Sequence, residues 1–330
     1  MVQNDSMASL PEKERRDATD KTLPVTVWAT EVITPQDHYN HGLVEILVAK
    51  RTKYQDLLIG DKGVYGRALF LDGRFQLAEG DEAYYSETLA HAPALLHGTP
   101  KTALVLGGGD GGVVRQLLKW KCIERVVVVD IDGEAVNACK RWLEKTHGNC
   151  WDDPRVELLI EDALVYIGRC SDKFDVVLSD LTDPVDDSPS LKLFCKEFFS
   201  SVKGCMEKNG VLAVQSGAAS LLEHRYHFPR IRRTLNEVFS HAVPFQVFAP
   251  SYGSPLGFCV ASDSNLDIFR NAAILDKLLK EGLSGHLEIL DGRAFQASFC
   301  LPVCVQRAMK EESVVYSESS IMPEWTVRSS

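Results

Sequence analysis

The feature that most constrains the fold of this chain is the glycine-rich segment GGGDGG at positions 107–112. An apolar run at 103–106 precedes it, and the apolar residues of 113–118 recur at helical spacing, so the pattern predicts a strand, a tight turn and a helix. Glycines let a backbone approach a ligand closely and adopt positive φ, and the start of a helix offers unpaired N–H groups. The segment therefore predicts a nucleotide site, but Asp110 within it would repel a phosphate or carboxylate and attract a cationic group.

The balance of charge favours a small cationic ligand over a nucleic acid. The 330 residues include 36 Lys and Arg against 46 Asp and Glu, which gives a net charge of −10. The alternative is that this acidity only keeps the protein soluble. Nine cysteines occur without CxxC spacing, which predicts reduced thiols in a cytoplasmic protein and no metal site. The chain has no long apolar stretch, so we expect neither a membrane span nor a secretion signal, while an organelle address stays open.

The first part of the chain predicts a small antiparallel β-domain over residues 23–80. Residues 1–22 are polar and charged, which is typical of a disordered leader. Strand-like segments follow at 25–28, 44–48, 55–59, 67–71 and 74–77, and Asp72-Gly73 is a hairpin signal between the last two. The next segment starts with Asp81 and Glu82 and predicts a helix, whose capping alone would explain these two acids.

From residue 101 onward, strands alternate with helices, which predicts a doubly wound parallel sheet of the Rossmann-like α/β class over residues 81–263. The expected strands lie at 103–106, 125–130, 156–160, 174–179 and 211–215, and an antiparallel edge hairpin follows at 245–248 and 256–260. The expected helices lie near 113–119, 134–143, 163–169, 192–205 and 221–239. We expect residues 264–330 to form an extension with one amphipathic helix, a strand-like segment near 294–301 and a polar tail.

Acidic residues follow the predicted strands, where open parallel sheets bind their ligands. Asp110 lies in the loop after the first strand, and Asp130, 23 positions beyond Gly107, ends the second, as expected of a residue that binds ribose hydroxyls. Asp162 follows the third strand and could accept a hydrogen bond from an adenine amino group. Together these residues outline an adenosine site, although the glycine loop alone would fit a nicotinamide cofactor equally well.

Asp180 and Asp183 follow the fourth strand and predict a site for an amine. Two carboxylates can bind an ammonium group and remove its proton, which an alkyl transfer to an amine requires because a protonated amine has no lone pair. The alternative is that these carboxylates are solvated or cap a helix.

These motifs resemble those of the polyamine aminopropyltransferases, the spermidine, spermine and thermospermine synthases. The resemblance covers residues 54–263 and includes 71–76, 81–87, the glycine loop, 130–132, 162–163 and 180–184. It implies an N-terminal β-domain on a class I methyltransferase-like domain, with decarboxylated S-adenosylmethionine as donor. It also implies 5′-methylthioadenosine as by-product, no metal, and a homodimer or homotetramer.

The resemblance also implies a role for individual residues. Asp180 would be the catalytic base, with Asp183 as its partner in holding the attacking amine. The donor would be bound by Gln55, Gln76, Gly107, Gly109, Asp110, Asp130, Asp162 and Ala163. The amine channel would be lined by Tyr85, Asp183, Gln215 and Tyr252. Because the decarboxylated donor ends in an ammonium group, Asp110 would favour it over the carboxylate of intact S-adenosylmethionine.

Departures from the commonest family pattern bear on the acceptor. Ser86 stands between Tyr85 and Glu87, where many members have His or Gln. The segments at 180–189 and 249–258 have lengths that resemble thermospermine synthases and the enzymes that aminopropylate agmatine or triamines, so we expect spermidine as acceptor. The glycine loop is closer to spermidine synthases, which keeps putrescine open. The alternatives of other classes are an amine N-methyltransferase using S-adenosylmethionine, a non-catalytic nucleoside-binding relative and a nicotinamide oxidoreductase.

Overall fold

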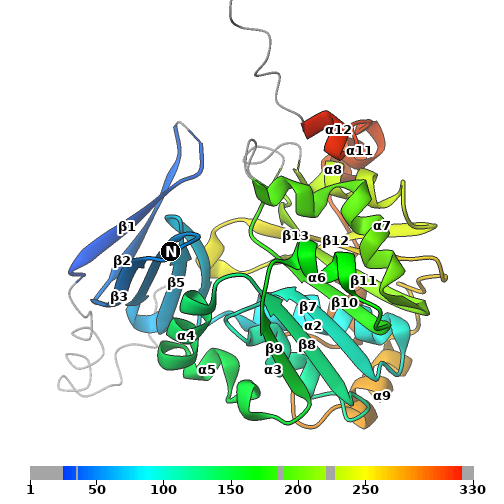
Figure 1. The fold of residues 1–330 in the computed structure, drawn as a ribbon, viewed down its shortest axis with the longest axis horizontal. Coiled ribbons are helices and arrows are strands. Elements are labelled where there is room, and N and C mark those ends of the chain that lie inside the picture. The colour runs from blue at the N-terminus through cyan, green and yellow to red at the C-terminus, as the bar shows by residue number, and fades with distance from the viewer. Residues whose placement is uncertain (1–24, 35, 185–188, 221–226, 322–330) are drawn as a thin grey trace, which may run out of the picture.

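The structure is a computed structural model that describes residues 25–34, 36–184, 189–220 and 227–321 (Figure 1). The predicted leader, residues 185–188 of the acidic segment and the expected start of a helix at 221–226 lie outside these ranges. In the described part of the chain, no helix is both long and apolar enough to cross a membrane.

Two antiparallel sheets form the N-terminal end, as the strand pattern predicts. One sheet pairs β1 (Val27–Val32) with β2 (His38–Leu43), and the other contains β3 (Glu45–Arg51), β4 (Asp56–Asp61), β5 (Arg67–Leu71) and β6 (Arg74–Ala78). Asp72 and Gly73 join β5 to β6 with φ of 49° and 73°, which fits a hairpin turn with two left-handed residues. Strand β2 was not predicted, because its sequence HYNHGL lacks an apolar alternation.

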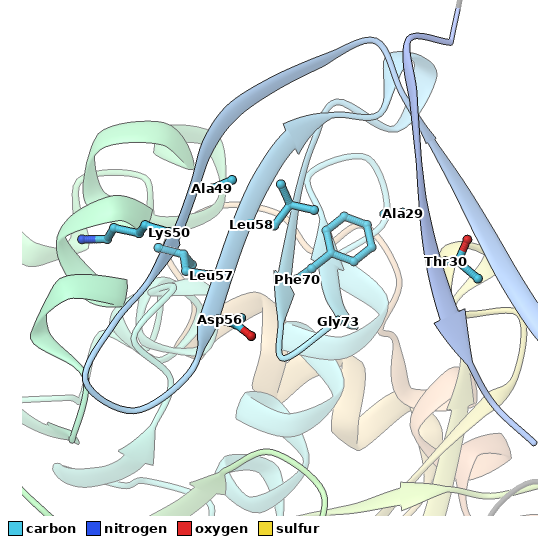
Figure 2. Close-up of a pocket in the computed structure, with 9 residues that line it drawn as sticks. All are labelled: Ala29, Thr30, Ala49, Lys50, Asp56, Leu57, Leu58, Phe70 and Gly73. Atoms are coloured by element: carbon cyan, nitrogen blue, oxygen red, sulfur yellow. The ribbon is translucent and has the colours of Figure 1, made fainter.

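A hollow of about 380 Å³ separates β1 from the four-stranded sheet (Figure 2). Its lining consists of Ala29, Thr30, Ala49, Lys50, Asp56, Leu57, Leu58, Phe70 and Gly73. None of the residues predicted to bind the donor or the amine lines this hollow.

A seven-stranded sheet forms the centre of the molecule, in the order β12-β13-β11-β10-β7-β8-β9. Its strands are β7 (Thr102–Gly107), β8 (Arg125–Asp130), β9 (Val156–Ile160), β10 (Phe174–Asp180), β11 (Met206–Ala218), β12 (His241–Phe248) and β13 (Pro255–Ser262). The five strands from β7 to β11 pair in parallel, and β13 and β12 add an antiparallel edge. The predicted Rossmann-like fold with an edge hairpin is therefore confirmed.

Helices cover both faces of this sheet (Figure 1). One face packs on α2 (Ala83–His97), α3 (Gly112–Leu118), α9 (Ala272–Gly282) and α10 (Gly292–Ser298), and the other on α6 (Ala163–Arg169), α7 (Lys196–Gly204), α8 (His227–Leu235) and α11 (Val303–Glu311). Neighbouring strand residues alternate between the two cores: Val105 packs in the first and Leu104 in the second. Because both faces are buried, the strands are continuous apolar runs. Short 3₁₀ turns occur at η1 (Gly63–Tyr65), η2 (Cys150–Asp152), η3 (Pro189–Phe194) and η4 (Pro250–Tyr252).

Helix α4 (Gly133–Trp142) connects the two parts of the molecule, and a short helix α5 (Glu144–His147) follows it. Its buried face, which includes Ala135 and Cys139, packs on Leu57 and Ile59 of β4. The N-terminal sheet is thereby held beside the end of β8, where the loop to α4 begins.

Up to residue 321, where the described part of the chain ends, the C-terminal extension contains four helices, α9, α10, α11 and α12 (Glu318–Ile321), rather than one helix and a strand. The predicted strand near 294–301 is wrong, because most of this segment forms α10. Phe295 and Phe299 lie four residues apart and are both buried, which is helical spacing. Asp291 caps α10, since its carboxylate accepts a 2.6 Å hydrogen bond from the Ala294 N–H group.

Candidate active site

The glycine loop lies where the strand order of the large sheet reverses. Strands β8 and β9 extend to one side of β7, whereas β10 pairs with β7 on the other side. Gly107 and Asp180 are paired neighbours at the carboxyl ends of β7 and β10. Open α/β sheets bind ligands at this kind of reversal, so the topology supports a site at the glycine loop.

The glycines are required by the conformation and crowding of this loop. Gly107, Gly108 and Gly111 have φ of 82°, 73° and 84°, a region that glycine adopts at little cost. A Cβ atom at Gly107 would lie 2.1 Å from the carbonyl oxygen of Asp180, and one at Gly109 would lie 2.6 Å from Oδ2 of Asp130. The loop is therefore confined between the ends of the two flanking strands.

Asp110 turns back on the start of α3. Its Oδ1 accepts a 2.7 Å hydrogen bond from the Gly112 N–H group. Burial and the charges of Glu82 and Asp130 together raise the pKa of the Asp110 carboxyl to about 6, although the Gly112 hydrogen bond lowers it. The negative charge of Asp110 in this loop is therefore uncompensated, and a cationic ligand would compensate it.

Asp130 and Asp132 organise the end of β8. Asp130 accepts hydrogen bonds from the N–H groups of Gly109 at 3.1 Å and Asp132 at 2.9 Å, and burial raises its pKa. Asp132 is almost fully buried, caps α4 and accepts hydrogen bonds from Thr52 Oγ1 at 2.6 Å and Gln55 Nε2 at 2.9 Å. Gln55, a predicted donor contact, is thus held at the end of β8 by a carboxylate that sequence reasoning did not assign.

Asp162 caps α6, with Oδ1 accepting a 2.8 Å hydrogen bond from the Leu164 N–H group. The Asp162 side chain is half-buried, and Ala163, the first residue of the helix, is buried. This geometry places both residues after β9, at the same edge of the sheet as Asp130.

Asp180 is the most perturbed carboxyl group at this edge. The Tyr85 hydroxyl donates a short hydrogen bond to Asp180 Oδ1, and Oδ2 lies 3.2 Å from the Cβ position of Gly108, so the carboxylate lies over the glycine loop. Burial and the charge of Asp110 raise the pKa of Asp180 to about 8, although the Tyr85 hydrogen bond lowers it. Burial and Asp180 together hold the Tyr85 pKa well above its usual value, so its hydroxyl remains a donor.

Four further residues predicted for the site are connected in two pairs by the structure. Gln215 Nε2 donates a 2.5 Å hydrogen bond to Asp183 Oδ1, which ties the segment after β10 to β11. Tyr252 donates a short hydrogen bond to the carbonyl oxygen of Gln76, which ties η4 to β6. Burial, and then the charges of Asp110 and Asp180, raise the pKa of Tyr252 well above its usual value.

The acids at the start of α2 have roles that the sequence did not show. Glu82 is the N-cap residue but does not cap the helix, so the capping interpretation is wrong for it. Its carboxylate instead accepts hydrogen bonds from Ser86 and Arg115. The two carboxylate oxygens of Asp81 accept hydrogen bonds, both 2.7 Å long, from the Ser251 hydroxyl and N–H groups, which fixes the turn that carries Tyr252.

Electrostatically, the edge of the sheet is anionic. Within the described ranges, the ion pairs of the structure give no lysine or arginine partner to Asp110, Asp130 or Asp180, whereas Arg115 pairs with Glu82. The three unpaired carboxylates are half-buried, and so are the neighbouring Gln55, Gln76, Tyr85, Asp162, Asp183, Gln215 and Tyr252. Such an arrangement can bind a polar ligand that carries positive charge.

Comparison with known proteins identifies the family. The chain matches the Spermine/spermidine synthase domain over residues 82–271 and the Spermidine synthase tetramerisation domain over residues 27–79. A polyamine aminopropyltransferase of Synechococcus sp. is 37% identical over 298 residues, which are 88% of this chain and 95% of the relative. The thermospermine synthase of Arabidopsis thaliana is 32% identical over 294 residues, which are 89% of this chain and 86% of the relative.

Solved structures agree with this assignment. The spermidine synthase from Thermotoga maritima has a TM-score of 0.79 and 25% identity to this chain, over 89% of this chain and 98% of that one. A spermidine synthase in complex with the transition state analogue AdoDATO has a TM-score of 0.80 and 25% identity, over 89% of this chain and 99% of that one. The resemblance seen in the motifs is therefore confirmed: this chain belongs to the spermine/spermidine synthase family and is an aminopropyltransferase enzyme.

Proposed function

We propose that this enzyme transfers the aminopropyl group of decarboxylated S-adenosylmethionine to spermidine and releases 5′-methylthioadenosine. The observation that carries the proposal is the pair Asp110 and Asp180, whose carboxyl groups have raised pKa values of about 6 and 8. Asp180 ends β10, and Asp110 lies in the loop that follows the neighbouring strand β7. Two cationic substrates would supply the positive charge that this pair lacks. A carboxylate in the glycine loop suits the donor's ammonium group and disfavours a carboxylated donor.

Donor binding would use the ends of β7, β8 and β9. Asp110 would hold the aminopropyl ammonium, Asp130 the ribose hydroxyls, and Asp162 with Ala163 the adenine. Gln55 and Gln76 would cover the donor from the N-terminal domain, and Gly107 and Gly109 would let the ligand approach the loop closely. The match to a spermidine synthase that binds AdoDATO supports a nucleoside ligand of this size.

The acceptor would be activated at Asp180. This carboxylate would take a proton from the attacking nitrogen, whose lone pair then forms a bond to the donor's propyl carbon while the bond from that carbon to sulfur breaks. A protonated amine in water has a pKa of about 10, so a carboxylate with a raised pKa accepts its proton at a smaller free-energy cost than an ordinary carboxylate. The bond from Tyr85 would orient Asp180, and Asp183 with Gln215 and Tyr252 would hold the rest of the amine.

Product analysis tests the acceptor. The purified enzyme is incubated with decarboxylated S-adenosylmethionine and putrescine, agmatine or spermidine in separate reactions, and products are identified by mass and fragmentation. We expect a tetraamine from spermidine as the fastest reaction, and fragmentation distinguishes thermospermine from spermine. Faster turnover of putrescine or agmatine would contradict the acceptor, and no methylthioadenosine from any amine would contradict the activity.

We further propose a homodimer or homotetramer in the cytoplasm, with domains at 23–80, 81–263 and 264–330. The match of residues 27–79 to a tetramerisation domain supports assembly of several copies. The free thiols of all nine cysteines suit a reducing compartment. Light scattering of the purified protein gives the oligomer mass directly.

A further inference from the structure

Tyr316, from the C-terminal extension, hydrogen-bonds to two helices, α7 and α8. Its N–H group donates to Thr234 Oγ1 at 3.0 Å on α8, and its carbonyl oxygen accepts from the Lys196 N–H group at 2.9 Å on α7. Its hydroxyl lies 2.7 Å from His227 Nδ1, and the Arg230 guanidinium lies over its ring at 5.3 Å. Tyr316 is only 4% exposed, so these contacts hold both its backbone and its ring in one position.

Helix α8 begins close to Asp183, one of the residues proposed to bind the amine. Helix α8 starts at His227 and lies after β11, the strand that carries Gln215. Gly217, near the end of β11, has a φ of 82°, and a Cβ atom there would lie 3.5 Å from Asp183 Oδ1 and 3.6 Å from His227 Cβ. The His227 side chain and the Asp183 carboxylate therefore both lie next to the backbone of Gly217.

We propose that Tyr316 is a positioning residue of the acceptor site, which acts through His227. The Tyr316 hydroxyl holds the His227 ring and thereby fixes the His227 side chain next to Gly217. This keeps the neighbouring Asp183–Gln215 pair, with its 2.5 Å hydrogen bond, in position to bind the amine. The inference rests on the proposed function, since it assumes that Asp183 holds the amine. It gives the C-terminal extension a part in acceptor binding, although Tyr316 follows Asp183 by more than a hundred residues.

A purely structural role for Tyr316 predicts a different result. Tyr316 belongs to the apolar cluster of α6, α7, α8 and α11, and so does Tyr166, which is equally buried at 4% exposure but lies on α6. If the hydroxyl of Tyr316 only stabilised this cluster, its removal would lower the melting temperature without a selective effect on the amine. If the Tyr316 hydroxyl positions the Asp183–Gln215 pair, its removal raises the KM for the amine while the KM for the donor stays constant.

The test compares Tyr316→Phe with the matched control Tyr166→Phe. Wild-type turnover of decarboxylated S-adenosylmethionine and spermidine is measured first, because its absence would overturn the proposed function itself. With turnover established, we expect Tyr316→Phe to raise the KM for spermidine about three- to tenfold, as the loss of one hydrogen bond implies. The KM for the donor and the affinity for methylthioadenosine should stay unchanged, and Tyr166→Phe should leave the KM for spermidine at the wild-type value.

A second variant keeps the test decisive if Tyr316→Phe folds poorly. His227→Asn removes the ring that Tyr316 holds, so we expect a similar rise in the KM for spermidine. The double variant should be no worse than His227→Asn alone, because both changes interrupt one contact. An unchanged KM for spermidine in a folded single variant, an equal rise in the donor KM, or additive effects in the double variant would each overturn the inference.

Discussion

In the proposed function, Asp110 is the residue that most directly selects the donor. Its carboxylate lies in the glycine loop, hydrogen-bonded to the start of α3, with a pKa raised to about 6 by burial and by neighbouring acids. A ligand with an ammonium group at this position would relieve the repulsion among Asp110, Glu82 and Asp130. A nucleoside without an ammonium group would not relieve this repulsion and would gain no affinity from Asp110.

We therefore expect Asp110→Asn to weaken binding of decarboxylated S-adenosylmethionine by at least about tenfold, which is the range for a hydrogen bond to a charged group. Methylthioadenosine serves as the matched ligand, because it lacks the aminopropyl group, and its affinity should hardly change. Titration calorimetry of both ligands gives the comparison. An equal loss for the two ligands would show that Asp110 holds the loop rather than the ammonium group.

The pH dependence of turnover should report the raised pKa of Asp180. The carboxyl group is protonated below its pKa of about 8 in the free enzyme and then has no capacity to accept a proton. We expect kcat/KM for spermidine to rise with pH up to this region and to fall by about tenfold for each pH unit below it. Bound cations stabilise the carboxylate, so the midpoint of kcat should lie at a lower pH. A flat kcat/KM profile between pH 6 and about 8 would contradict this assignment.

At the scale of elements, helix α2 links the site to the C-terminal extension through Glu87. This carboxylate is fully buried and accepts hydrogen bonds from the N–H groups of Glu288 at 2.8 Å, Ile289 at 2.9 Å and Leu290 at 3.2 Å. Lys119 lies 4.0 Å away and donates to the carbonyl of His286 at 2.9 Å. Tyr85, two residues before Glu87, thus lies on a helix whose position depends on a distant segment.

Glu87→Gln should destabilise the protein, because a side-chain amide has one acceptor oxygen where the carboxylate has two, and N–H groups would be left unpaired. We expect a loss of about 1–3 kcal/mol in the free energy of unfolding. Hydrogen exchange should increase at residues 288–290 more than elsewhere. Glu281→Gln, at a carboxylate that is 66% exposed, is the control and should change neither quantity. Equal stability of the two variants would contradict this role of Glu87.

The helices and strands that the sequence predicted correctly are those that local patterns define. The strand, glycine loop and helix at 102–118 are adjacent in the chain, and each acidic strand end follows its own apolar run, so parallel topology alone brings them to one edge. The contacts of Asp81 with Ser251, and of Glu87 with residues 288–290, join segments about 170 and 200 positions apart. No spacing rule predicts such contacts.

The two wrong predictions of secondary structure concern segments whose local pattern is ambiguous. The segment around α10 contains short apolar groups that also suit a strand, and its helix depends on a cap at Asp291 and on burial of Phe295 and Phe299. Strand β2 consists of polar residues and glycine and is defined by pairing with β1 rather than by its own pattern. In both cases tertiary contacts decide what the local pattern leaves ambiguous.

For the whole molecule, the N-terminal sheets present apolar side chains that suit contact between copies. On β1, the side chains of Trp28 and Val32 are 62% and 53% exposed. The same strand carries Ala29 and Thr30, which line the hollow between the two sheets (Figure 2). This region lies within the match to the tetramerisation domain. Exposed apolar groups that cluster on one element are typical of an interface.

We expect Trp28→Ser to reduce the oligomer mass measured by sedimentation or light scattering at micromolar concentration. Phe269→Ser is a matched control, because Phe269 is also 62% exposed but lies outside residues 27–79. The control should leave the oligomer mass unchanged. If the Trp28 variant keeps the wild-type mass, assembly does not depend on this surface of β1.

The measurement that tests the central claim most directly is the turnover of Asp180→Asn with saturating decarboxylated S-adenosylmethionine and spermidine. We predict that kcat falls by at least about a hundredfold, the usual contribution of a positioned base, while methylthioadenosine binds as tightly as in the wild type. Asp172→Asn, at an exposed carboxylate just before the opposite end of β10, should retain full activity. Near-wild-type turnover of Asp180→Asn would contradict the account, because the amine would then lose its proton elsewhere.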